Sequence, residues 1–204
     1  MATPSANTVM LIQPVVLSGR RVRLEPLSLD HLDALSAVGL DQEIWRWIPY
    51  RVSSREEMRA FIENALQLQA EGSALPFATV EQSTNLVVGS TRFMNIDKPN
   101  RHVEIGSTWI GRNWQRTFVN TEAKYLMLRH AFEVLGCFRV ELKTDVLNEK
   151  SRNAISRIGA KEEGIFRKHV VCWDGRIRDS IWFSIIDSEW PGVKAELEEK
   201  LKRG

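Results

Sequence analysis

The part of the sequence that decides the fold lies between residues 104 and 136 and reads EIGSTWIGRNWQRTFVNTEAKYLMLRHAFEVLG. Apolar and polar residues alternate over 102–110, which predicts a half-buried strand. We expect its two faces to carry Val103, Ile105 and Trp109 on one side and Glu104, Thr108 and Ile110 on the other. A loop over 111–120 follows, and then a helix over 121–135 that Gly136 ends.

The apolar stripe of that helix predicts that the helix is largely buried, and it consists of Tyr125, Leu128, Phe132 and Leu135, widened by Met127 and Val134. Outward from it, strands are expected near 20–26 and over 77–82, 86–96, 138–142, 165–173 and 181–186. Helix starts are expected at Ser28, at Ser53 or Ser54, at Asn148 and at Pro191. Strands and helices alternate without strict βαβ regularity, so the fold class is predicted to be α/β, of the α+β type.

Length and composition restrict the class of protein. The chain has 204 residues, of which 43% are hydrophobic and 26% charged, which is typical of a soluble globular domain. We expect residues 1–18 to be a loose lead-in and residues 19–204 to form a single domain. A net charge of +2 argues against a dedicated nucleic-acid binder. Two cysteines, no secretory signal and no apolar run of about 18 residues predict a cytoplasmic protein without membrane contact.

Familiar catalytic motifs are missing from the sequence. The four histidines are scattered, so no metal site is predicted, and there is no G-x-S-x-G, Walker or G-x-G-x-x-G motif. Cys137 is interpreted as a buried structural thiol in preference to a nucleophile. What remains is the junction of 114–120 with the helix start, where free backbone N–H groups and Arg116 could bind an anion. A purely structural cap by Asn120 or Thr121 explains this junction equally well.

Several short motifs follow one another at definite spacings: Arg20-x-Arg-x-Arg-Leu-Glu-Pro-Leu, Val88-Gly89-Ser90, Glu104-Ile105-Gly106, Thr121-Glu122-Ala123, Asn148-x-x-Ser151 closed by Gly159, and Asp174-Gly175-Arg176 followed by Trp182-Phe183-Ser184. In this order they resemble the GNAT superfamily of acyl-CoA-dependent N-acyltransferases, in the branch typified by the RimJ/RimL ribosomal-protein alanine acetyltransferases. The resemblance extends from about residue 19 to about residue 190.

The resemblance implies a GNAT fold, with a mixed, mostly antiparallel sheet that splays open after the Glu104 strand and is flanked by helices. It implies acetyl-CoA as cofactor, with CoA as product, bound in the splay. The positions implied to bind it are Trp109, Ile110, Arg112, Arg116, Thr117, Phe118, Val119, Asn120, Thr121, Asn148 and Ser151. One departure stands out, because the family loop Q/R-x-x-G-x-G/A aligns with residues 114–119, which contain no glycine.

Two residues are implied to act in catalysis. Glu104 occupies the carboxylate position of the branch and is the candidate base for the acceptor amine. An ion pair with a cation on a partly solvent-exposed sheet face accounts for a glutamate at this position equally well. Ser151 is the candidate for hydrogen bonding to the cofactor sulfur or to a water, and a small residue in a first helical turn is the alternative. Many GNAT enzymes use a tyrosine acid four residues after the serine, and here that residue is Ile155.

The sequence therefore predicts an N-acetyltransferase that moves an acetyl group from acetyl-CoA to a primary amine by direct attack in a ternary complex. A non-catalytic acyl-CoA-binding or sensor protein of the same fold is the alternative. Residues 45–47 and 58–68 would wall an acceptor site or belong to the core. A homodimer through tryptophan-rich surfaces is a further expectation, and the identity of the acceptor stays open.

Overall fold

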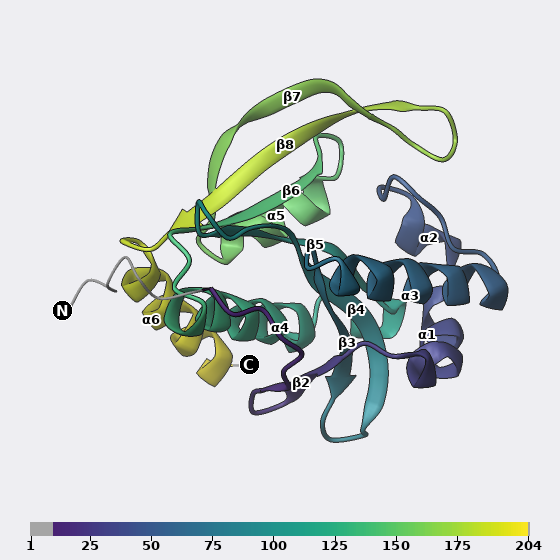
Figure 1. Ribbon diagram of the computed structural model, residues 1–204, viewed down its shortest axis with the longest axis horizontal. Coiled ribbons are helices and arrows are strands. Elements are labelled where there is room, and N and C mark those ends of the chain that lie inside the picture. The colour runs from purple at the N-terminus through teal and green to yellow at the C-terminus, as the bar shows by residue number, and fades with distance from the viewer. Residues whose placement is uncertain (1–9, 204) are drawn as a thin grey trace.

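The computed structural model describes residues 10–203, which form an eight-stranded sheet flanked by helices (Figure 1). The order along the sheet is β1-β2-β3-β4-β5-β6-β8-β7. The strands are β1 (Leu17–Ser18), β2 (Val22–Pro26), β3 (Leu75–Glu81), β4 (Leu86–Asp97), β5 (His102–Ile110), β6 (Arg139–Asp145), β7 (Lys161–Val171) and β8 (Ile177–Ile186). Neighbours are antiparallel except β5 and β6, which are parallel. The predicted mixed, mostly antiparallel sheet is confirmed.

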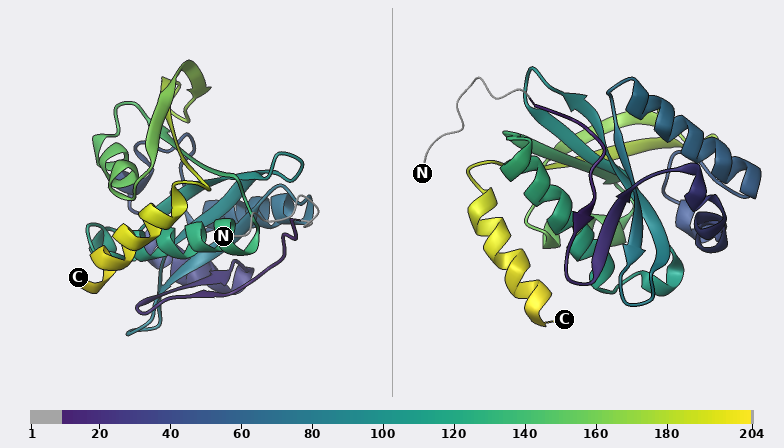
Figure 2. Two further views of the ribbon diagram at one scale, coloured as in Figure 1. Left: turned by 90° about the vertical axis from the view of Figure 1, so that its left-hand side faces the viewer. Right: turned by 60° about the horizontal axis from the view of Figure 1, so that its bottom comes forward.

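Helices cover both faces of the sheet. They are α1 (Leu32–Gly39), α2 (Gln42–Trp45), α3 (Arg55–Ala70), α4 (Phe118–Arg129), α5 (Glu149–Arg157) and α6 (Trp190–Arg203). The α1 and α3 helices lie on one face, and α4 lies on the other with α6 beside it (Figure 2). Within residues 10–203, no helix is long and apolar enough to cross a membrane.

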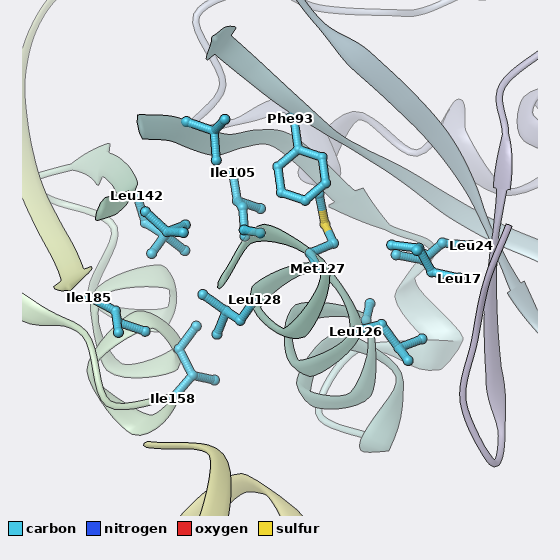
Figure 3. Close-up of a cluster of buried hydrophobic side chains, with 14 of the residues drawn as sticks. Leu17, Leu24, Phe93, Ile105, Leu126, Met127, Leu128, Leu142, Ile158 and Ile185 are labelled. Atoms are coloured by element: carbon cyan, nitrogen blue, oxygen red, sulfur yellow. The ribbon is translucent and has the colours of Figure 1, made fainter. Parts of the chain in front are cut away.

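Two apolar clusters hold these layers together. The larger one joins α4 to the sheet and includes Phe93 and Ile105. Figure 3 shows Leu126 of α4 on the side of Leu17 and Leu24, and Leu128 on the side of Ile158 and Ile185. The smaller cluster lies under α1 and α3 and is built around Leu35, Trp45, Met58, Ile62 and Trp109. The central strands β3, β4 and β5 are therefore covered on both faces, and the face of a residue on β4 or β5 decides which helices it meets.

The pairing of β5 with β6 is short. Only three residue pairs connect the strands, from His102 with Arg139 to Glu104 with Glu141. Beyond Glu104 the two strands separate, and β6, β7 and β8 turn away from β1–β5 (Figure 1). We call this divergence the splay. It lies where the resemblance predicted it, directly after the Glu104 strand.

A β-bulge in β5 corrects the predicted faces of this strand. Gly106 pairs with Arg92 of β4, but Trp109 pairs with Ser90, so β5 carries one extra residue at this point. Ser107 has a φ of 49°, in the left-handed region. The bulge shifts the alternation, and Trp109 joins the cluster under α1 and α3. Trp109 was predicted to share a face with Val103 and Ile105, and Glu104 was predicted to share a face with Thr108 and Ile110. Both predictions are wrong, because the bulge places these residues on opposite faces.

The helix after β5 differs from its prediction at both ends. It begins at Phe118, because the Thr117 hydroxyl accepts a hydrogen bond from the backbone N–H of Val119 and caps the helix. The predicted cap by Asn120 or Thr121 is wrong. A π-helical turn over His130–Val134 follows, and Val134 is 67% exposed, so it does not widen the buried stripe.

Other sequence predictions hold. Ser54 caps α3 and Asn148 caps α5, each accepting a backbone N–H three residues later. Part of the predicted lead-in, residues 1–9, lies outside the described residues. Of the remainder, Met10 and Leu17 are buried in the larger cluster.

Candidate active site

Glu104 lies at the point where β5 and β6 begin to separate, and its carboxylate is nearly inaccessible, with the residue 2% exposed. The Oε2 atom accepts hydrogen bonds from Asn95 Nδ2 at 2.7 Å and from Lys143 Nζ at 2.8 Å. Lys143 is on β6, so this ion pair bridges the two strands of the splay. Among the described residues, no donor binds Oε1. One carboxylate oxygen is fixed and the other remains able to accept a proton.

A glycine two positions later makes room for this carboxylate. Residues two apart on a strand share a face, so Gly106 lies beside the Glu104 side chain. A Cβ at Gly106 would come within 2.9 Å of Glu104 Oε1 and 2.6 Å of Met94 Sδ. The Glu104-x-Gly106 spacing is therefore explained by close approach, with no role for an unusual φ at the glycine.

A group of aromatic rings lies beside Lys143 on the far side of the splay, with the Trp182 ring in direct contact with the lysine. Its Nζ lies 4.7 Å from the centre of the Trp182 ring, and that ring packs on Phe166. His169 completes the group, with Nδ1 3.0 Å from Ser180 Oγ. Burial, followed by the charges of Lys143 and Arg178, lowers the pKa of His169 below its ordinary value. His169 is thus held neutral at physiological pH.

The loop between α2 and α3 contacts the β7–β8 hairpin across this face. The backbone N–H of Trp173 donates to the Pro49 carbonyl at 2.8 Å. The Tyr50 hydroxyl makes a short hydrogen bond with Ser107 at the bulge. Residues 47–50 therefore join the α3 side of the sheet to the hairpin, above the splay. Trp45 and Met58, expected either at the acceptor site or in the core, are fully buried in the core.

The edge of β5 that faces the splay fits a ligand that carries amide groups. After Glu104, β5 pairs with β4 on one side and has no strand partner on the other within residues 10–203. Unpaired backbone groups on a strand edge are the usual binding site for an extended, amide-containing chain such as pantetheine. Trp109 and Ile110 lie on this stretch, and the Ile110 carbonyl also accepts a hydrogen bond from Gln115 Nε2 at 2.9 Å.

The loop that follows β5 makes its turn without glycine. Arg116 has a φ of 62°, so a bulky residue occupies the left-handed conformation that glycine favours. Its side chain is exposed at the start of α4. Arg112 forms an ion pair with Asp41, Nε to Oδ2 at 2.8 Å, and so points toward the α1–α2 connection. Arg116, but not Arg112, is placed beside the free N–H groups of a helix start.

The first turn of α4 holds the other residues predicted to bind the cofactor. Thr117 caps the helix, and the ring of Phe118 lies 4.0 Å beneath the Arg21 guanidinium carbon. Val119 is buried in the larger cluster and Asn120 is half-buried. Thr121 Oγ1 accepts a hydrogen bond from Arg157 Nη2 at 2.9 Å, which ties α4 to α5. Their roles toward a cofactor stay predictions.

The start of α5 carries the second predicted group. The Asn148 side chain caps the helix by accepting the backbone N–H of Ser151 at 3.1 Å. The Ser151 hydroxyl is half-buried and has no hydrogen-bond partner among the described residues. Ile155, at the position of the tyrosine acid in many GNAT enzymes, belongs to the apolar core. The chain therefore offers a hydroxyl here and no acid. Away from the site, burial raises the pKa of the Cys137 thiol to about 12, as expected for an unreactive structural cysteine.

The prediction from the sequence did not identify several residues near the site. Asn95 and Lys143 hold Glu104, and Lys124 of α4 lies buried on the opposite face of β5. Lys124 Nζ donates to Thr108 Oγ1 at 2.6 Å and to Thr91 Oγ1 at 3.3 Å. Burial lowers its pKa to about 7. The position of Lys124 four residues before Leu128, on the apolar side of the predicted helix, was a signal in the sequence.

Comparison with known proteins fits this geometry. Residues 21–161 match the family model described as "Acetyltransferase (GNAT) domain". The chain belongs to the GNAT acetyltransferase family. A GCN5-related N-acetyltransferase from Brucella melitensis superposes with a TM-score of 0.85 and 34% identity, over 95% of this chain and 89% of that one. The splay, the bulge and the α4 start are thus parts of a GNAT domain.

One relative in sequence supports the RimJ/RimL-type branch of the GNAT family, and one solved RimJ structure shares the fold. "Putative ribosomal N-acetyltransferase YdaF" of Bacillus subtilis (strain 168) is 36% identical over 106 residues, which cover 52% of this chain and 57% of that protein. Mycobacterium smegmatis RimJ, solved in complex with CoA-disulfide, has a TM-score of 0.78 at 22% identity, over 91% of each chain. The second likeness concerns the fold alone.

Proposed function

We propose that this GNAT domain is an N-acetyltransferase that moves the acetyl group of acetyl-CoA to a primary amine, of a protein or peptide N-terminus or of a small molecule. The observation that carries the proposal is the Glu104 carboxylate, fixed through Oε2 at the start of the splay with Oε1 unengaged. The β5 edge and the α4 start would hold the pantetheine and pyrophosphate of the cofactor.

The residues of the chain suit direct transfer in a ternary complex. When bound, acetyl-CoA supplies an activated acyl carbonyl and a thiolate leaving group. Glu104 Oε1 takes the proton of the acceptor amine, directly or through water, as the N–C bond forms and the C–S bond breaks. Ile155 offers no proton, so the departing thiolate would take its proton from solvent, and the half-buried Ser151 hydroxyl would be available to donate a hydrogen bond to the sulfur. Turnover is therefore expected to be slow.

The test is an assay of thiol release from acetyl-CoA by the purified chain with peptides that begin with alanine or serine. The name of the Bacillus relative makes ribosomal-protein N-termini the first acceptors to try. We expect thiol release to depend on the acceptor, with a gain of one acetyl mass on the peptide and none on the enzyme. Acetyl-enzyme formation would contradict direct attack.

The glycine-free loop and Ile155 favour a second candidate, a non-catalytic acyl-CoA-binding protein. Calorimetric titration with acetyl-CoA and CoA separates the two. Binding without thiol release on any acceptor favours the binder, whereas binding with acceptor-dependent release favours the enzyme.

We also propose that residues 19–204 act as one domain, in the cytoplasm and as a homodimer. Two free, buried cysteines support a reducing compartment. Exposed apolar side chains on the β7–β8 hairpin, Phe166, Val171 and Trp173 among them, support a dimer contact. Sedimentation of the purified chain tests the dimer.

A further inference from the structure

Two buried arginines lie on the same face of the sheet as Glu104 without a carboxylate partner. Arg92 of β4 and Arg178 of β8 are each only 5% exposed. In both, Nε is fully buried and has no hydrogen-bond partner among residues 10–203. An arginine is seldom buried unless an anion or several acceptors compensate its charge.

Arg92 points toward α3 and the bulge. Its neighbours Thr91 and Phe93 face α4, so alternation places the Arg92 side chain on the opposite face. The guanidinium carbon lies 5.1 Å from the centre of the Phe61 ring, and Tyr50 is a titratable neighbour of Arg92. On the strand, Arg92 pairs with Gly106, next to the bulge.

Arg178 faces the same region from the hairpin side. Its Nη1 donates to the Trp47 carbonyl at 3.4 Å, which is a long hydrogen bond. The two carboxylates whose charges act on Arg178 already have cationic partners. Asp145 pairs with Arg176 at 2.7 Å, and Glu104 pairs with Lys143 at 2.8 Å. The charge of Arg178 is thus surplus, as is that of Arg92.

Both arginines border the loop segment 47–50, Arg178 through the Trp47 carbonyl and Arg92 through its position beside Tyr50. Desolvation lowers the pKa of each guanidinium below its ordinary value, although arginine remains charged at physiological pH. A guanidinium prefers a planar, bidentate anion, above all a carboxylate. The amine acceptor is the molecule that must enter on this face, which carries Glu104.

We propose that Arg92 and Arg178 bind a carboxylate of the acceptor, so that the preferred substrate is an amine that also carries a carboxylate. This inference rests on the proposed acetyl transfer. The carboxylate belongs either to a free amino acid or to a peptide with an acidic residue near its N-terminus. The two arginines are specificity-determining residues, and Glu104 retains the proton transfer.

The experiment uses matched acceptors with the full chain and acetyl-CoA. One pair is an amino acid and its amide, and the other is a peptide with glutamate or glutamine at its second position. We expect kcat/KM to favour the carboxylate member of at least one pair by about 10- to 100-fold, the range of a charge-assisted hydrogen bond. The pair that shows the preference identifies the source of the carboxylate. Equal kcat/KM within both pairs would overturn the proposal.

Variants assign the preference to the arginines. R92Q should remove the preference, because it lowers kcat/KM for the carboxylate member of the pair by about 10- to 100-fold more than for the amide member. If R92Q does not fold, R178Q serves the same purpose. R59Q is the matched control, because Arg59 is an exposed arginine of α3 paired with Glu63. A preference that survives in R92Q and R178Q, or that R59Q removes as well, would contradict the proposal.

A binding measurement separates this inference from the proposed function. Quenching of tryptophan fluorescence by an N-acetylated amino acid and by its amide, with CoA present, needs no turnover. Tighter binding of the carboxylate form by the wild type, and its loss in R92Q, would support the inference even if no acceptor is acetylated. Equal binding of the two forms would overturn it whatever the activity.

Discussion

Each face of β5 meets a lysine from a neighbouring element, half-buried Lys143 of β6 on one face and buried Lys124 of α4 on the other, and the environments of the two lysines are opposite. On the α3 face, Lys143 meets the Glu104 carboxylate at 2.8 Å and the Trp182 ring. On the α4 face, Lys124 meets only the hydroxyls of Thr108 and Thr91. A carboxylate and a ring face stabilise an ammonium, whereas two hydroxyls do not replace its lost hydration.

We therefore assign the proposed functional role to the Lys143–Glu104 pair and a structural role to Lys124 with its two threonines. Lys143 holds the Glu104 carboxylate in place at the splay, where proton transfer is proposed. Lys124 approaches neutrality near pH 7 and joins three elements, β4, β5 and α4, through a small hydroxyl network in which Thr91 and Thr108 lie 2.7 Å apart. The same residue type therefore supports the proposed base on one face and contributes to packing on the other.

Replacing Glu104 by glutamine would remove the proposed base from the α3 face of β5. The amide cannot accept the amine proton, so we expect E104Q to lower kcat by about 10²- to 10⁴-fold, the range of general base catalysis. Calorimetry should show CoA binding within a few-fold of wild type. E141Q is the control, because Glu141 is the β6 residue paired with Glu104 in register. Full turnover by E104Q on the true acceptor would exclude Glu104 as the base.

Replacing Lys124 by methionine would remove the cost of burying an ammonium group between β5 and α4. The unfolded lysine has a pKa of 10.5 and burial lowers the folded value to about 7. The unfolded chain thus binds the proton more tightly, and the free energy of unfolding falls as pH drops from about 10.5 to 7, then stays low below 7. At about 1.4 kcal/mol per pKa unit, K124M should be more stable at pH 7 by up to about 5 kcal/mol.

Urea unfolding at pH 6, 7, 8 and 9.5 measures this effect. The stability gap between K124M and wild type should be largest at pH 6–7 and shrink toward pH 9.5. K150M, at an exposed lysine of α5, should match wild type throughout. A gap that is equal at pH 7 and 9.5 would show that packing, and not the charge of Lys124, determines the difference.

Replacing Lys143 by methionine should lower the stability of the protein, whereas replacing Lys124 should raise it. The change leaves Glu104 charged and buried with Asn95 as its single donor, so we expect the free energy of unfolding at pH 7 to fall by about 3 kcal/mol. Adding E104Q should restore much of the loss, because the uncompensated charge is then gone. Chemical denaturation of the single and double variants measures this coupling. Additive losses would mean that the ion pair contributes little.

The smallest effect is expected in the loop between β5 and α4. Arg116 holds a left-handed conformation, which costs a residue with a Cβ about 1–2 kcal/mol. R116G should therefore be more stable than R116A by about 1 kcal/mol, since both variants lose the same charge. Thermal unfolding of the two compares them directly. Equal stability would indicate that the turn relaxes once the arginine is removed.

Local signals in the sequence predicted local structure well. Ser54 and Asn148 are caps because their side chains accept N–H groups three residues away, which spacing alone reveals. The bulge at Ser107 could not be predicted, since a serine with positive φ gives no local signal, and one inserted residue reverses every later face of β5.

The candidate site was predicted only in part for a related reason. Glu104 was identified through its motif, but its partner Lys143 lies 39 residues away and meets it only through the parallel pairing of β5 with β6. Arg92 and Arg178 come from strands on opposite sides of the splay. Partnerships of this kind depend on tertiary geometry, which periodicity does not contain.

The three residue pairs between β5 and β6 also have a mechanical consequence. They form a narrow connection between a five-stranded lobe and a three-stranded lobe of the sheet. The Glu104–Lys143 ion pair links the two lobes where this connection meets the splay. The group proposed to take the proton from the substrate therefore also contributes to holding the two lobes together.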